Sequence, residues 1–166
     1  MAGTHRYLVA LGSNMRHARH GSPPQVLGAA LRKLAKQGIK VEAIAPTIAS
    51  APVGPSLRRY ANTAAVVQAM LAPEELLALC KRLEREFGRK RGGRRWGSRV
   101  LDLDIVLWSG GMWGSRRLTI PHPAFRERAF VLGPAAAIAP RWRDPLTGLT
   151  IKQLEARLTR RTRLPR

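Results

Sequence analysis

Two spacings of apolar residues alternate along this chain, one typical of strands and one typical of helices. Around Leu101, Leu103 and Ile105 apolar and polar side chains alternate with a period of two, which indicates a strand with one buried face. Elsewhere apolar residues recur three and four positions apart, the spacing of an amphipathic helix. The predicted strands cover residues 7–11, 39–49, 62–70 and 100–107, and the predicted helices cover residues 23–38, 73–88, 125–138 and 150–158.

Helix-start signals support the first two helices. Ser22 stands before Pro23, and Gln25 follows at the third helical position, which is the pattern of a capping box. The second helix begins at Pro73 with two glutamates in its first turn, where acidic side chains complement the helix dipole. The resulting β-α-β-β-α-β order predicts an α+β chain with a ferredoxin-like core and appended C-terminal helices. We expect both core helices on one sheet face and the other face to be available for a ligand.

Composition adds a strong electrostatic bias to this picture. The 166 residues carry 30 lysines and arginines against 10 acidic residues, a formal charge of +20, which predicts an anionic partner. Nothing in the pattern divides residues 1–166, so we expect a single domain, with residues 157–166 forming an unstructured basic tail. The lone Cys80 excludes an internal disulfide and favours a reducing cytoplasm. It lies on an apolar helix stripe, which predicts a buried, inert thiol. No apolar stretch is long enough to span a bilayer.

The most informative chemistry is the pair Asp102 and Asp104, which the period of two places on one face of a strand. Two carboxylates this close repel each other unless positive charge lies nearby. Either a hard cation such as Mg²⁺ or the neighbouring arginines, among them Arg94, Arg95 and Arg99, could supply that charge. The arginines also suit phosphate, so the combination favours a site for a metal-complexed polyphosphate over a purely structural ion-pair cluster.

Four motifs in this order resemble the 6-hydroxymethyl-7,8-dihydropterin pyrophosphokinase family. They are Leu11-Gly12-Ser13-Asn14; Tyr60-Ala61-Asn62; the block 88–105 with Trp96-Gly97, Arg99 and Leu101-Asp102-Leu103-Asp104-Ile105; and Ile120-Pro121-His122-Pro123 followed by Arg128 and Phe130-Val131-Leu132. The resemblance covers residues 7–142. It implies a ferredoxin-like enzyme of folate biosynthesis that transfers the pyrophosphoryl group of ATP to the hydroxymethyl group of the pterin and releases AMP.

On the nucleotide side, the resemblance implies roles for charged residues. Asp102 and Asp104 would hold Mg²⁺, with two ions expected, against the ATP phosphates. The catalytic set would be these two aspartates with Arg89 and Arg99. The implied ATP-binding residues are Arg89, Arg91, Trp96, Arg99, His122 and Arg128. Residues 88–98 would form a mobile lid.

On the pterin side, the resemblance implies a slot for a flat heterocycle. Tyr60 and Phe130 would stack on the two ring faces, and Asn62 would read the ring edge through its amide. Ser50, Pro52 and Val53 would contribute from the preceding loop. The expected partners are therefore ATP and the pterin, with no specific nucleic acid and no membrane, and the expected state is a monomer.

Two alternatives from other classes remain open on the residues alone. RNA-recognition modules share this element order and suit a charge of +20. They stack bases on strand aromatics, however, whereas residues 62–70 contain no aromatic side chain and the first strand offers only Tyr7. The second alternative is a catalytically silent nucleotide-binding homologue, against which the presence of both aspartates and of Arg89 and Arg99 argues.

Overall fold

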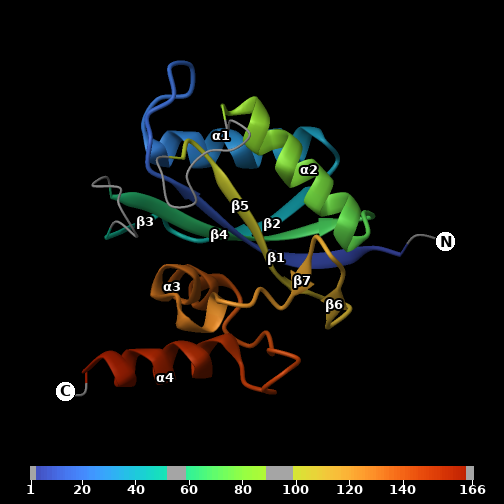
Figure 1. Cartoon of the computed structure of the whole chain (residues 1–166), viewed down its shortest axis with the longest axis vertical. Coiled ribbons are helices and arrows are strands. Elements are labelled where there is room, and N and C mark those ends of the chain that lie inside the picture. The colour runs from blue at the N-terminus through green and yellow to red at the C-terminus, as the bar shows by residue number, and fades with distance from the viewer. Residues whose placement is uncertain (1–2, 52–58, 89–98, 164–166) are drawn as a thin grey trace.

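The computed structural model describes residues 3–51, 59–88 and 99–163, and within them a five-stranded antiparallel sheet forms the centre (Figure 1). The strand order is β2-β4-β1-β5, with β3 pairing to β4 beside β2. The strands are β1 (His5–Ser13), β2 (Lys40–Ile44), β3 (Ile48–Ser50), β4 (Tyr60–Ala69) and β5 (Asp102–Trp108). This order and the helices between the strands confirm the predicted ferredoxin-like core.

Helices α1 (Pro23–Lys36) and α2 (Pro73–Glu86) pack on one face of the sheet, as predicted. The capping box forms at α1, where the Ser22 N–H donates to Gln25 Oε1 at 2.9 Å. Their apolar stripes, including Leu27, Leu34, Leu76 and Leu83, meet the alternate residues of the strands in a continuous core. Cys80 belongs to this core, and burial raises the pKa of its thiol to about 12, which confirms the expected inert thiol.

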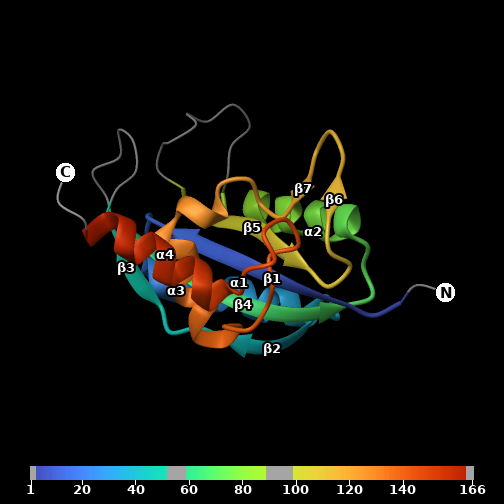
Figure 2. The same cartoon turned by 90° about the horizontal axis from the view of Figure 1, so that it is seen from below.

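The opposite face of the sheet is covered where we expected it to be open. Helix α3 (Ala129–Ile138) lies against it and α4 (Ile151–Arg163) packs on α3, so the structure has an additional layer (Figures 1 and 2). Strand residues such as Leu8, Val66 and Val106 are buried under these helices. The appended helices therefore complete a second core rather than projecting from the first. Within the described residues, these helices leave a pocket at one end of this sheet face.

The chain departs from the predicted elements in four further places. The strand expected over 39–49 is two strands, because Pro46 lacks the N–H that a continuous ladder needs. The helix expected over 125–138 is a short 3₁₀ turn, η1 (Phe125–Glu127), followed by α3. A small hairpin of β6 (Trp113–Gly114) and β7 (Thr119–Ile120) was not predicted.

The fourth departure is the basic tail, which is helical as far as Arg163 instead of unstructured from Arg157. Ile151 and Leu154 are buried and Leu158 is partly buried against α3, while Arg157 and Arg160 face solvent. An amphipathic helix thus accommodates arginines that, taken by composition alone, predicted disorder. No helix in the described part of the chain is long and apolar enough to cross a membrane.

Candidate active site

The register of the sheet places the two aspartates and Asn62 on the strands that flank β1, close to Gly12. Gly12 of the central strand β1 pairs with Asn62 of β4 on one side and with Asp102 of β5 on the other. Two residues earlier on β1, Ala10 pairs with Asp104. Because side chains alternate between faces, Asn62, Asp102 and Asp104 all project toward the face that carries α3. The small residues between them leave an open floor.

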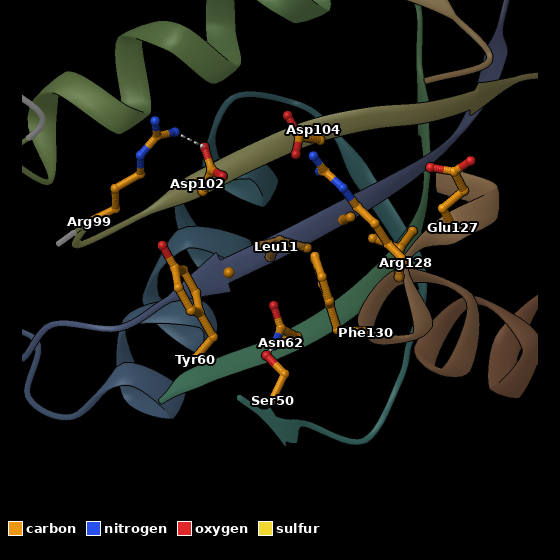
Figure 3. Close-up of a pocket in the computed structure, with 13 residues that line it drawn as sticks. Leu11, Ser50, Tyr60, Asn62, Arg99, Asp102, Asp104, Glu127, Arg128 and Phe130 are labelled. Atoms are coloured by element: carbon orange, nitrogen blue, oxygen red, sulfur yellow. Dashed lines mark hydrogen bonds and ion pairs between the residues drawn. The ribbon is translucent and has the colours of Figure 1, made fainter. Parts of the chain in front are cut away.

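A pocket of about 470 Å³ occupies this end of the sheet, next to the start of α3 (Figure 3). Strands β1, β3, β4 and β5 supply its floor and sides, and the segment around the N-terminus of α3 closes the remaining side. The lining residues are Ala10, Leu11, Gly12, Ser50, Tyr60, Asn62, Arg99, Asp102, Asp104, Glu127, Arg128, Phe130 and Val131. Residues separated by up to 121 positions, Ala10 and Val131, thus share one cavity.

The apolar side of the pocket has two aromatic rings and one amide. Tyr60 and Phe130 lie on opposite sides of Asn62 in Figure 3, with the space between them open. Asn62 is buried, and its Nδ2 donates to Ser50 Oγ at 2.6 Å, which fixes the direction of the amide. Burial, followed by the nearby Asp102 charge, raises the pKa of Tyr60, so its hydroxyl stays protonated at neutral pH.

The absence of a side chain at Gly12 leaves room for the Asn62 amide and the Tyr60 ring. A Cβ at this position would lie 3.2 Å from Asn62 Oδ1 and 3.6 Å from Tyr60 Cδ1. The first distance is tighter than an ordinary van der Waals contact, so a side chain here would press on the amide. The missing side chain lets the strand backbone itself form the pocket floor.

The polar side of the pocket is built around Asp102. Arg99 Nη1 lies 3.2 Å from Asp102 Oδ1, and both side chains are partly exposed. Buried Asn14 holds the Arg99 backbone at both of its polar groups: its Oδ1 accepts the Arg99 N–H at 2.7 Å, and its own N–H donates to the Arg99 carbonyl at 3.1 Å. The end of the first strand therefore positions the arginine that pairs with the first aspartate.

His122 lies beside the second aspartate. Its Nε2 is 4.0 Å from Asp104 Oδ1, and its Nδ1 accepts the Ala124 N–H at 3.2 Å. Burial, and then the Arg128 guanidinium, lower the pKa of His122 below its ordinary value, while Asp102 acts in the opposite direction. At neutral pH the imidazole is therefore uncharged, with its Nε2 proton available for donation toward the pocket.

The structure tests the position of only some of the predicted site residues. It places eight of them around the pocket and His122 at its edge; these are Ser50, Tyr60, Asn62, Arg99, Asp102, Asp104, Arg128 and Phe130. The remaining five, Pro52, Val53, Arg89, Arg91 and Trp96, lie outside the described residues, as does most of the predicted lid.

Several residues that line or support the pocket were not predicted as site residues from the sequence. Glu127 and Leu11 line it, and Asn14 supports Arg99 from behind. Asn14 had a signal, because it ends the first of the recognised motifs. Glu127 had none, since an acid beside arginines in a loop is ordinary surface composition.

The donor set at the pocket suits a divalent cation that shares its coordination shell. Two carboxylates offer hard oxygen ligands, which fit Mg²⁺. No group of three or more metal-ligating side chains occurs among the residues that the structure describes. Two protein ligands leave most of an octahedral shell for water and phosphate oxygens, which is how Mg²⁺ is commonly held with a nucleotide.

Comparison with known proteins identifies the family. The family model described as 7,8-dihydro-6-hydroxymethylpterin-pyrophosphokinase matches residues 8–140. The chain belongs to this family. It is 40% identical over 151 residues, 90% of this chain and 74% of the relative, to a 2-amino-4-hydroxy-6-hydroxymethyldihydropteridine pyrophosphokinase of Synechocystis.

Longer proteins contain the same unit. A folate synthesis bifunctional protein of Arabidopsis thaliana, mitochondrial by its name, is 38% identical over 131 residues, which are 78% of this chain but 23% of that protein. A crystal structure of Plasmodium falciparum HPPK-DHPS superposes with a TM-score of 0.74 at 12% identity, covering 96% of this chain and 44% of that one. This chain therefore spans less than half of the bifunctional proteins, and the structural likeness concerns the fold.

Proposed function

We propose that this protein transfers the β,γ-pyrophosphoryl group of ATP to the hydroxymethyl oxygen of 6-hydroxymethyl-7,8-dihydropterin, releasing AMP, in folate biosynthesis. The observation that carries the proposal is that one pocket combines an aromatic slot with a directional amide and, across Gly12, a carboxylate pair with an arginine. The family assignment and the folate synthesis names of the relatives support the same activity.

The pterin binds in the slot between Tyr60 and Phe130. A flat heterocycle gains stacking and apolar burial from two facing rings. The Asn62 amide presents a donor and an acceptor to the ring edge, and the Ser50 hydroxyl keeps that amide in one orientation. Gly12 allows the heterocycle to approach the strand backbone. Pro52 and Val53, which lie outside the described residues, are proposed to complete this side.

The ATP phosphates bind along the polar side of the pocket. Asp102 and Asp104 would hold Mg²⁺, for which we propose two ions, and the metal would supply charge neutralisation for the transferred group and for the leaving phosphate. Arg99 and Arg128 provide guanidinium groups for phosphate oxygens. His122 donates a hydrogen bond from Nε2 in its neutral form. Arg89, Arg91 and Trp96 are proposed to contribute from the segment that the structure does not describe.

The protein contributes to the reaction by positioning the two substrates rather than by forming a covalent intermediate. The hydroxymethyl oxygen forms a bond to the β-phosphorus, its proton is released, and the bond from the β-phosphorus to the bridging oxygen of AMP breaks. The proposal is supported by the register, which pairs Gly12 with Asn62 on one side and with Asp102 on the other, so that a pterin beside Asn62 would lie next to phosphates held near Asp102. No side chain becomes attached to either substrate.

The described residues do not present the aromatic sheet surface that the RNA-binding alternative needs. Tyr7, the sole aromatic that the first strand offers, is fully buried, and its hydroxyl donates to the Leu71 carbonyl at 2.5 Å. The sheet face that RNA-recognition modules use for stacking is covered by α3 over the part that carries Leu8, Val66 and Val106, which leaves the pocket rather than an extended surface.

A direct assay separates the proposed enzyme from a catalytically silent homologue. Purified protein given ATP, Mg²⁺ and the pterin should release AMP in a pterin-dependent manner, detected by a coupled enzyme assay, and should form the pterin pyrophosphate. Release of ADP, or no turnover that depends on the pterin, would refute the proposal. We also propose a single-domain, cytoplasmic monomer, which size-exclusion chromatography with light scattering and cell fractionation would test.

A further inference from the structure

Glu84 is a buried acid in a part of the fold where a charged group is costly. It lies on α2, its side chain is fully buried, and it follows Cys80 by one helical turn on the stripe that faces the sheet. Burying a carboxylate costs several kcal/mol unless hydrogen bonds and a counter-charge compensate. An acid on this apolar stripe therefore depends on its polar contacts.

Both oxygens of this carboxylate have an assigned contact. Oε1 accepts the N–H of Leu103 at 2.9 Å, and Oε2 lies 3.4 Å from Nζ of Lys81, whose side chain reaches solvent. The contact with Leu103 crosses from α2 to strand β5. It joins the helix to the peptide group between Asp102 and Leu103, and Asp104 follows directly.

This hydrogen bond supplies the acceptor that a neighbouring strand would otherwise provide. Strand β5 ends the strand order of the described sheet and pairs with β1 on one side. In an antiparallel ladder, alternate residues of an edge strand direct their N–H groups away from the sheet. The Leu103 N–H is such a group, and being buried it needs an acceptor. Glu84 satisfies it at the point where the strand carries its two aspartates.

We propose that Glu84 is a positioning residue for the carboxylate pair, an assignment that rests on the proposed function. Asp102 and Asp104 carry like charges on an edge strand, so both their mutual repulsion and the pull of a bound cation act on this backbone. The hydrogen bond to Leu103 ties the peptide between them to a packed helix. Outer-shell groups of this kind commonly change metal affinity or activity by about 10- to 100-fold when they are removed.

Two substitutions separate the hydrogen bond from the charge. Glu84→Gln keeps an acceptor oxygen at the same reach and removes the charge, whereas Glu84→Asp keeps the charge and withdraws the acceptor by one methylene. Both keep a polar side chain close to the native volume. Glu86→Gln and Glu86→Asp are matched controls, because Glu86 lies on the same helix, is about 43% exposed and pairs with Lys33 at the surface.

The first measurement is amide hydrogen exchange at Leu103 in the metal-free protein. The second is the dissociation constant of Mn²⁺, as a probe for the divalent ion, in the presence of a nonhydrolysable ATP analogue. We expect Glu84→Asp to accelerate Leu103 exchange and weaken Mn²⁺ binding at least about tenfold, while the pterin dissociation constant changes less than about threefold. Glu84→Gln should stay within about threefold of the wild type in Mn²⁺ affinity, and the Glu86 variants should match the wild type.

Three results would overturn the proposal. Native Mn²⁺ affinity in Glu84→Asp despite faster Leu103 exchange would make the bond merely structural. Equal losses in the Gln and Asp variants would assign the effect to general destabilisation, and a loss in Gln alone would assign it to the charge. If the wild type releases no AMP, the proposed activity fails, but exchange and Mn²⁺ binding still decide the role of Glu84.

Discussion

Asp102→Asn should abolish activity without destabilising the metal-free protein. The substitution keeps the shape of the side chain and removes one of two like charges. Residues two apart on a strand are about 7 Å apart, so two carboxylates there repel by about 0.6 kcal/mol at the dielectric of water and about 2.4 kcal/mol at an effective dielectric of 20. Both side chains are about a third exposed, which places the repulsion between these limits.

The substitution also removes the ion pair with Arg99, which offsets part of this gain. That pair spans 3.2 Å between partly exposed side chains and contributes under about 1 kcal/mol. The net expectation is a free energy of unfolding that is unchanged or higher by about 1 kcal/mol, corresponding to a rise in melting temperature of about 2–4 °C at most.

With ligand bound, the wild type should become the more stable of the two proteins. At a hundred times its dissociation constant, a Mg²⁺–ATP analogue should stabilise the wild type by about 2.7 kcal/mol, and Asp102→Asn should lose most of this stabilisation. Turnover should fall at least about a hundredfold, since a metal that neutralises phosphate contributes several kcal/mol. Differential scanning calorimetry with and without ligand, together with AMP release, measures both effects.

Glu127→Gln is the matched control, because it removes one carboxylate charge from another side of the same pocket. It should retain most of the ligand-induced rise in melting temperature. The reasoning is refuted if Asp102→Asn unfolds several degrees below the wild type without ligand, because the aspartate would then be a structural ion-pair member. Wild-type ligand stabilisation in this variant would equally refute the metal assignment.

Four further predictions concern individual side chains. Phe130→Ala should raise the KM for the pterin by about 5- to 100-fold through lost stacking, with a smaller change in the KM for ATP; equal changes would contradict the slot. The pKa of His122 is lowered in the folded state by burial and then by a neighbouring guanidinium, so its contribution to stability is present above pH 6.5 and is lost as pH falls toward the folded pKa. His122→Gln should therefore flatten the pH dependence of urea unfolding below pH 6.5, and an unchanged slope would count against this. Arg126→Met should lower the free energy of unfolding by about 3 kcal/mol, because Arg126 donates to both oxygens of the fully buried Asp144 at 2.6 and 2.8 Å; a loss under about 1 kcal/mol would contradict it. The Cys80 thiol should react with a thiol reagent only on unfolding, and rapid labelling of the native protein would disprove its burial.

The local patterns predicted the elements well where one face of an element is buried along its whole length. The alternation around Leu103 and the stripes of α1 and α2 meet this condition, because burial of one face forces a fixed spacing of apolar residues. Short elements carry too few residues for a period to show, so the two-residue strands of the β6–β7 hairpin were missed. Leu158 and the arginines around it were interpreted by composition, although packing on α3 makes this segment helical.

The same contrast holds for the site. The motifs around Gly12, Asn62 and Asp102 could be recognised in the sequence, and alternation alone placed both aspartates on one strand face. Glu84 could have been noticed as an acid on an apolar helix stripe, but its acceptor role depends on where α2 crosses β5. Asn14 likewise gained a role only through a backbone segment 85 positions away.

The sequence by itself determined which residues form strands and helices and which side chains carry the charge and the chemistry, because spacing and residue type are local properties. The tertiary structure alone decided that Gly12 separates Asn62 from Asp102, and that α3 covers the part of the sheet face beside the pocket. It also decided that Glu84 ties the aspartate strand to a helix. These features depend on strand register and helix docking, which are set by the packing of residues far apart in the chain rather than by any local pattern.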